Sequence, residues 1–133
     1  MLNLLVVDDD SIDVMTLKRG LERAGIEYVL NEAFDGVSAL EALRSGKFPL
    51  ERLLVVLDLN MPRMNGLEFL RALRTDSVLG STRVLVLTTS TQETDRAEAA
   101  RLHVAGYFVK PLDFAPFVEL LKTIDRYWAA SLF

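Results

Sequence analysis

The feature that most restricts the fold of this chain is a fivefold alternation of short apolar runs with segments of helical periodicity. The runs that we expect to form strands cover residues 2–7, 28–33, 53–57, 84–87 and 106–109. The expected helices cover residues 12–24, 36–45, 66–74, 91–102 and 113–130. The first, third and fourth runs are almost continuous Leu and Val, which is typical of parallel strands covered on both faces. The sequence therefore predicts an α/β fold with a doubly wound, five-stranded parallel sheet of flavodoxin-like type.

Residues that favour helix N-caps come just before each expected helix. They are Asp10 or Ser11, Asp35, Asn65, Ser90 and Asp113. Ser90 is followed three residues later by Glu93, which is the pattern of a capping box. These signals support the expected start of every helix.

Length and composition narrow the class of protein. With 133 residues and no linker-like segment, the chain is expected to be one domain, residues 1–133. The absence of Cys excludes disulfides and thiolate metal sites and fits a cytoplasmic protein. A formal net charge of −4 with mixed signs argues against nucleic acid as a partner. No apolar run approaches the ~20 residues that a membrane span needs, so no membrane association is expected.

Polar side chains follow four of the five expected strands. Asp8 and Asp9 follow the first, Asp58 the third, Thr88 the fourth and Lys110 the fifth. In parallel sheets of this kind, ligands bind outside the carboxyl ends of the strands, at the point where the strand order reverses. With the flavodoxin-like order 2-1-3-4-5, the three aspartates come from neighbouring strands. We therefore expect the functional site at this edge.

The chemistry of this set points to a metal ion and a phosphoryl group. Clustered carboxylates cannot all remain ionised without a counter-charge. An oxygen-only donor set suits a hard cation, and Mg²⁺ in particular takes one or two carboxylates together with phosphate oxygens. Lys110 and Thr88 are suited to the remaining phosphate oxygens. One carboxylate can then attack the phosphorus and form an aspartyl phosphate.

The segments "VVDDD", "VLDLNMPRMNGLEFL", "VLVLTTS" and "GYFVKPL" occur in this order. Together they resemble the receiver domain of bacterial two-component response regulators, over essentially the whole chain. The resemblance implies that Asp58 is the phosphoacceptor. It also implies that Asp9, Asp58 and the carbonyl of Asn60 ligate Mg²⁺, and that Asp8 holds a metal-bound water. Asp10 is then left as a helix cap.

The same resemblance assigns roles to the residues after the last two strands. Thr88 would bond the phosphoryl oxygen and Lys110 would pair with it, which completes a catalytic set with Asp58. Tyr107 matches the aromatic switch residue, which turns inward as Thr88 moves toward the phosphate. The Lys110–Pro111 peptide bond would be cis, and Gly66 is expected to allow an unusual backbone angle or a close approach.

The C-terminal segment "VKPLDFAPFVELLKTIDRYW" is similar to a subgroup of single-domain receivers that serve phytochrome-type histidine kinases. The expected partner is therefore a histidine kinase of that type, within a phosphorelay. The only His of the chain, His103, has no acidic residues near it at the spacing of a functional site. The phosphoryl donor would therefore be another protein. The chain is expected to signal through a protein contact and not to be an enzyme.

A competing interpretation is an enzyme. Asp8-x-Asp10 behind an apolar strand, with a later Thr and Lys, also fits a haloacid-dehalogenase-like phosphatase that uses Asp8 as its nucleophile. That family needs a late acidic pair for Mg²⁺, which this sequence lacks after Lys110. It would also leave Asp58 and Asn60 unexplained.

The last expected helix is more apolar than one core requires. Phe117, Leu121, Ile124 and Trp128 form a stripe at helical spacing. Leu120, Tyr127 and the tail that ends at Phe133 add further apolar surface. A large apolar patch tends to mark an interface. The sequence therefore predicts a homodimer that is joined through Leu120, Tyr127, Trp128 and Phe133.

Overall fold

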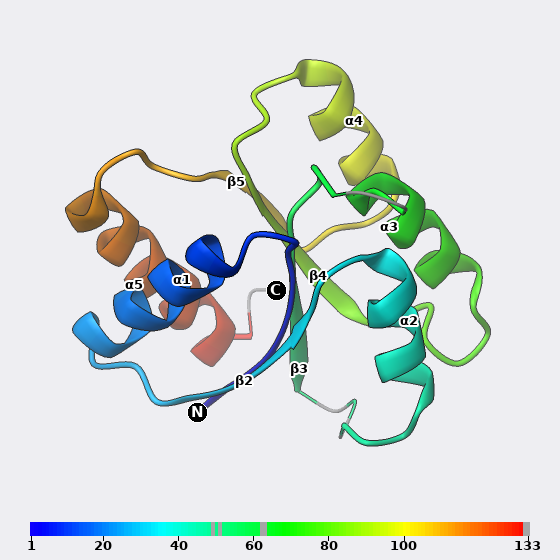
Figure 1. Ribbon diagram of the computed structural model, residues 1–133, viewed down its shortest axis with the longest axis horizontal. Helices are drawn as coiled ribbons and strands as arrows, with labels where there is room; N and C mark the ends of the chain where they lie inside the picture. Colours follow the sequence, from blue (N-terminus) through cyan, green and yellow to red (C-terminus); the bar gives the residue numbers. More distant parts are fainter. Residues whose placement is uncertain (49, 51, 62–63, 132–133) are drawn as a thin grey trace.

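The computed structural model describes residues 1–48, 50, 52–61 and 64–131. Strands and helices alternate along the chain, as the sequence predicts (Figure 1). In chain order they are β1 (Leu2–Val7), α1 (Ser11–Arg23), β2 (Tyr28–Ala33), α2 (Gly36–Arg44), β3 (Leu53–Leu57), α3 (Gly66–Thr75), β4 (Arg83–Thr88), α4 (Glu93–Arg101), β5 (Gly106–Val109) and α5 (Phe114–Ala129). The expected boundaries differ from these by at most two residues.

The five strands form one parallel sheet in the order β2-β1-β3-β4-β5, which confirms the predicted topology. Helices α1 and α5 pack together on one face, and α2, α3 and α4 cover the other (Figure 1). The strand order reverses between β1 and β3, so residues after these two strands lie side by side at the switch point.

Strand β3 shows why the central runs are continuously apolar. All five of its residues are buried. Leu53, Val55 and Leu57 face the core beneath α2, α3 and α4. Leu54 and Val56 face the second core, beneath α1 and α5. Alternate residues of a strand point to opposite faces, so a strand covered on both sides needs apolar residues at every position.

The first three helices begin as expected. The carboxylate of Asp10 accepts a hydrogen bond from the Ile12 N–H at 2.9 Å, so Asp10 caps α1. Asp35 accepts from the Ser38 N–H and caps α2. Asn65 forms a complete capping box at the start of α3.

The fourth and fifth helix starts differ from the prediction. Gln92 is the N-cap residue of α4 and makes no side-chain cap bond, so the expected Ser90–Glu93 capping box is wrong. The Ser90 hydroxyl instead donates to Asp95 Oδ2 at 2.7 Å, because a carboxylate from the helix's first turn competes for it. Asp113 occupies the N-cap position of α5 without a side-chain cap bond.

Helix α5 buries its predicted apolar stripe. Trp128, with only 5% of its surface exposed, packs in the second core, and two guanidinium groups lie 5.3 Å from its ring centroid. The Trp128 ring therefore leaves little surface for a second chain, and the expected dimer interface stays a prediction. Leu120 is half-buried against the same core, Tyr127 is 42% exposed, and Phe133 lies outside the described residues. Within the described segments, no helix has the length and hydrophobicity that crossing a bilayer requires.

Candidate functional site

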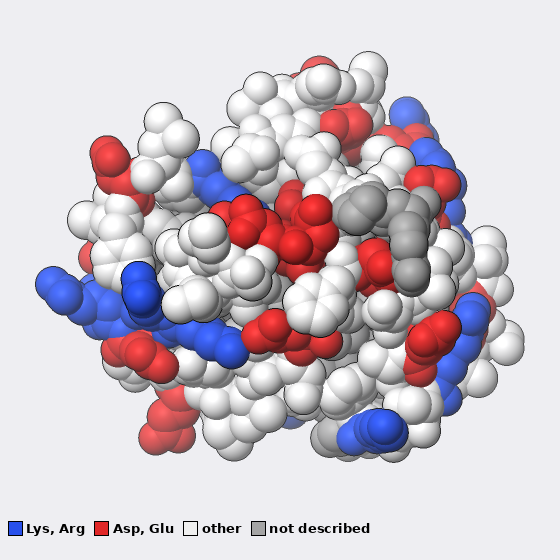
Figure 2. Space-filling model, viewed as in Figure 1, with Lys and Arg blue, Asp and Glu red and all other residues white. Residues whose placement is uncertain are grey.

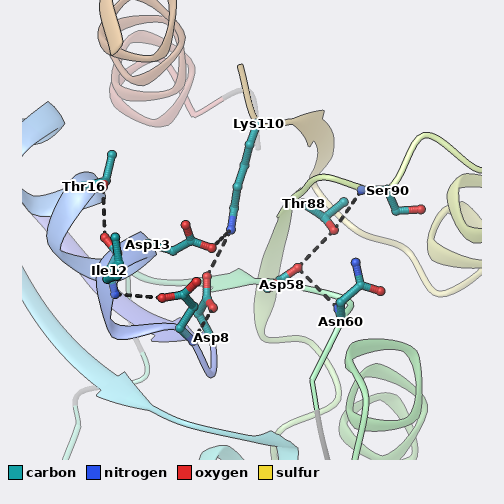
Figure 3. A network of polar contacts seen from close by, with 10 residues as sticks. Asp8, Ile12, Asp13, Thr16, Asp58, Asn60, Thr88, Ser90 and Lys110 are labelled. Atoms are coloured by element: carbon teal, nitrogen blue, oxygen red, sulfur yellow. Dashed lines mark hydrogen bonds and ion pairs between the residues drawn. The ribbon is translucent and has the colours of Figure 1, made fainter. Parts of the chain in front are cut away.

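The sheet extends its backbone hydrogen bonding just past the strand ends, which fixes the residues that follow them. The Asp8 N–H donates to the Ala33 carbonyl, and the Asp58 N–H donates to the Val7 carbonyl at 2.9 Å. The Lys110 N–H donates to the Thr88 carbonyl at 2.8 Å. Four of the five expected side chains, those of Asp8, Asp58, Thr88 and Lys110, therefore converge at one edge, as Figure 3 shows.

Three carboxylates meet at this edge. One oxygen atom from each of Asp8, Asp13 and Asp58 lies within 4.8 Å of the others. Asp8 and Asp58 are buried and Asp13 is half-buried. Acidic side chains also gather at the centre of this face of the molecule (Figure 2). Asp13 was missed at the sequence level; the available signal was an acid in the first turn of a helix that starts at the same edge.

Lys110 is held by two of these carboxylates. Its Nζ donates to Asp8 Oδ2 at 3.1 Å and to Asp13 Oδ2 at 3.0 Å, and its side chain is 15% exposed. Burial by itself would lower the pKa of Lys110. The charges of Asp8 and Asp58 and the bond to Asp13 outweigh burial, so the pKa of the ammonium is raised. Lys110 is therefore a firmly charged group.

The pKa of Asp8 is also raised, but for a carboxyl group this shift disfavours the charged form. Burial is the largest influence and raises the pKa of its carboxyl, and the neighbouring charge of Asp58 acts in the same direction. The Asp10 N–H and the Lys110 ammonium lower it, but they do not compensate for burial. The Lys110 ammonium thus does not fully offset the cost of burying the Asp8 carboxylate.

Among the described residues, hydrogen bonds reach only one of the two carboxylate oxygens of Asp58. Its Oδ1 accepts from the Thr88 hydroxyl at 3.0 Å and from the Asn60 N–H at 3.3 Å. Among the described residues, none donates a hydrogen bond to Oδ2. These contacts fix the orientation of the carboxylate while one oxygen remains available to react.

A cavity of about 260 Å³ opens beside Asp58, between α1 and the segment from β5 into α5. Its polar side is lined by Asp8, Asp13, Asp58 and Lys110. Its floor is apolar and includes Val56 and other core residues. A small polar group can therefore approach Asp58 and Lys110 together.

Asp9 and Asn60 do not join the cluster of three carboxylates. They line a separate, open hollow of about 610 Å³ together with Asp95. The structure thus brings Asp8 close to Asp58, whereas Asp9 shares the open hollow with Asn60. The Asn60 N–H contact to Asp58 links the two groups.

The predicted switch residues are connected through Ser90. The Thr88 hydroxyl oxygen accepts from the Ser90 N–H at 3.3 Å, and the Tyr107 hydroxyl donates to the Ser90 carbonyl at 3.1 Å. Tyr107 is half-buried, with the Arg96 guanidinium 4.6 Å from its ring centroid. A continuous set of contacts therefore runs from Asp58 to Tyr107.

The expected cis bond before Pro111 is wrong. No peptide bond between described residues is cis, so the Lys110–Pro111 bond is trans. A following proline reduces the preference for trans but does not remove it, so the sequence does not fix the isomer.

Gly66 confirms the expected close approach. Its N–H donates to the Leu59 carbonyl at 3.0 Å. A Cβ atom at this position would lie 2.6 Å from both the Asp58 carbonyl oxygen and the Leu59 Cα. The β3–α3 connection therefore needs glycine here to fold tightly behind Asp58.

Comparisons with known proteins agree with this geometry. The family model for the response regulator receiver domain matches residues 4–122. The chemotaxis protein CheY-3 of Vibrio cholerae is 37% identical over 123 residues, which is 92% of this chain and 91% of that protein. The phosphorylated cyanobacterial phytochrome response regulator RcpA superposes with a TM-score of 0.84 at 27% identity, covering 97% of this chain and 94% of RcpA. The Mn²⁺-bound response regulator Rcp1 gives 0.82 at 28% identity, covering 96% and 94%.

Proposed function

This chain belongs to the response regulator receiver domain family, and on that premise we propose that Asp58 accepts a phosphoryl group from a histidine kinase. The observation that carries the proposal is the state of the Asp58 carboxylate. Thr88 and Asn60 orient it through Oδ1, no described residue donates a hydrogen bond to Oδ2, and Asp58 lines the same cavity as Lys110. The nucleophile and a positive charge for the incoming group thus share one space.

The proposed transfer is a single displacement. Asp58 Oδ2 forms a bond to phosphorus as the bond from phosphorus to the donor's histidine nitrogen breaks, and the nitrogen leaves with the electron pair. Lys110 neutralises charge on the phosphoryl oxygens, and the Thr88 hydroxyl donates to one of them. The product is an acyl phosphate on Asp58.

The residues present fit a divalent cation. Carboxylates without thiolate or imidazole suit Mg²⁺, and one oxygen from each of Asp8, Asp13 and Asp58 lies within 4.8 Å of the others. We propose that Asp8, Asp9, Asp58 and Asn60 hold Mg²⁺. When bound, the ion would neutralise developing charge on the phosphoryl group.

Phosphorylation is proposed to switch a protein surface. Thr88 would move its hydroxyl from Asp58 Oδ1 to the phosphoryl oxygen. The Thr88 hydroxyl oxygen accepts from the Ser90 N–H, and the Ser90 carbonyl accepts from the Tyr107 hydroxyl. Movement of Thr88 would therefore change the space available to the Tyr107 ring. The output of the chain would then be a changed protein contact and not a chemical turnover.

Exposed apolar side chains around the cavity support a docking partner. Leu112 and Phe114 both line the cavity, and they are fully exposed and 42% exposed, respectively. Apolar groups clustered around a polar site tend to mark a protein interface. Receiver domains interact with histidine kinases, and the likeness to RcpA supports a phytochrome-type kinase as the proposed partner.

Two further expectations remain proposals. A homodimer through α5 now depends on Leu120 and Tyr127, since Trp128 is buried within its own chain. A cytoplasmic location, without nucleic acid or membrane partners, stays a prediction of the sequence.

The function is tested by labelling with acetyl phosphate and measuring the intact mass. Wild type should gain one phosphoryl group in the presence of Mg²⁺ and none after chelation. Asp58→Asn should abolish the product. Asp10→Asn, which removes an exposed carboxylate that only caps α1, should keep it.

The same assay separates the phosphatase alternative. A haloacid-dehalogenase-like enzyme would lose labelling in Asp8→Asn and retain it in Asp58→Asn. Full labelling of Asp58→Asn would therefore refute the proposed phosphoacceptor.

A further inference from the structure

We propose that Asp13 is a positioning residue that holds Lys110 away from Asp58 in the unphosphorylated protein and releases it when a phosphoryl group arrives. The proposal rests on the proposed function of Asp58 and Lys110. Its consequence is that the Asp13–Lys110 ion pair determines how tightly the site holds a phosphoryl group.

The contacts show where the ammonium is held. Lys110 Nζ lies 3.0 Å from Asp13 Oδ2 and 3.1 Å from Asp8 Oδ2. Ion pairs to both are present, whereas within the described part of the chain Lys110 makes none to Asp58. In Figure 3, Asp13 and Asp58 lie on opposite sides of the end of the Lys110 side chain. The lysine is thus drawn toward α1.

Pairing with a phosphoryl group on Asp58 competes with these contacts. An ammonium has three N–H donors, and two already point to Asp8 and Asp13. An anion on the opposite side would bond the third donor and draw the ammonium away from Asp8 and Asp13, which weakens this pairing. The two carboxylates differ in their surroundings: the Asp8 side chain is 7% exposed, whereas that of Asp13 is 40% exposed. Water can solvate Asp13 after release, so Asp13 is the partner that is easier to leave.

The fold leaves space for the movement. Asp13, Asp58 and Lys110 all line the cavity of about 260 Å³ beside α1. The ammonium can therefore cross from Asp13 toward Asp58 without displacing packed core side chains. A half-exposed ion pair is weak, so we expect its removal to change the binding equilibrium by about two- to five-fold.

The test uses beryllofluoride, a phosphoryl analogue, titrated into the full chain with Mg²⁺ and followed by calorimetry. Asp13→Asn should lower the dissociation constant by about two- to five-fold, because Lys110 no longer has to leave a carboxylate. Asp13→Glu restores a carboxylate and should return the constant toward the wild-type value. Thermal unfolding of each variant verifies the fold.

Asp113→Asn is the matched control for charge. Asp113 lines the same cavity, but it makes no ion pair with Lys110. Removing its charge should leave the constant within two-fold of wild type.

The outcomes separate the two proposals. If Asp13→Asn matches Asp113→Asn, or binds the analogue more weakly than wild type, the positioning role is refuted. If Asp13→Glu behaves as Asp13→Asn, the role is refuted as well. If wild type neither binds beryllofluoride nor accepts phosphate on Asp58, the proposed function has failed.

Discussion

Gly66→Ala is expected to damage both stability and phosphorylation, through one added methyl group. The new Cβ would lie 2.6 Å from the Asp58 carbonyl oxygen and from the Leu59 Cα, where ordinary contacts start at 3.4 Å. Both atoms belong to the backbone, so no side-chain rotation relieves the overlap. The β3–α3 connection has to move, and Asp58 moves with it.

The magnitude follows from two opposing effects. Overpacking of a close contact costs about 1–3 kcal/mol. Replacing glycine with alanine reduces the freedom of the unfolded chain and returns about 0.4–1 kcal/mol. The net loss should be about 1–2 kcal/mol, which for a chain of this length lowers Tm by about 3–7 °C.

Two measurements check this prediction. Thermal unfolding gives the loss of stability, and the rate of labelling by acetyl phosphate gives the effect on Asp58. We expect labelling to slow by at least about ten-fold, because small displacements of a reacting group cost much of its rate.

Gly20→Ala is the matched control. Its Cβ would also approach to 2.6 Å, but the contacted atom is Leu121 Cδ1, the end of a flexible side chain in the α1–α5 contact. It should cost less stability and leave the labelling rate unchanged. A Gly66→Ala protein with wild-type Tm and wild-type labelling would show that the connection behind Asp58 is not tightly constrained.

Two further predictions test the switch and the dimer. Thr88→Ala should still be phosphorylated on Asp58, but phosphorylation should change its affinity for the kinase much less than in wild type. The reason is that the Thr88 hydroxyl, which links Asp58 to Ser90, is removed. A variant whose affinity for the kinase responds as fully as that of wild type would refute the switch. Wild type should sediment as a homodimer at tens of micromolar. Tyr127→Glu should sediment as a monomer, since a charge at this position disrupts the apolar surface of α5. Wild type that stays monomeric, phosphorylated or not, would refute the dimer hypothesis.

The sequence determined the fold and the position of the site. Continuous apolar runs such as β3 occur only where a strand is covered on both faces, and their alternation with helices requires a parallel sheet. Once that sheet is accepted, the residues that follow the strands have to meet at its carboxyl edge. Asp8, Asp58, Thr88 and Lys110 were therefore identifiable from their place in the chain.

Only the tertiary structure decided which of these groups contact one another. Lys110 pairs with Asp8 and with Asp13, which lies 97 residues away in the chain. Arg74 likewise donates to carbonyl groups from two separate loops, at Thr82 and Leu102, which its sequence position does not suggest.

The reason is physical. Strand and helix patterns are local, because hydrophobic periodicity repeats over a few residues. The acceptor that a long polar side chain reaches depends on distances of about an ångström. The distance between α1 and the β5–α5 connection is set only when α1 and α5 pack together on the sheet. The isomer of the Lys110–Pro111 bond depends on a small difference in free energy. The partner of Ser90 depends on which acceptor the fold brings within reach. Sequence therefore determined the edge where the chemistry occurs, and packing determined which residue holds the lysine there.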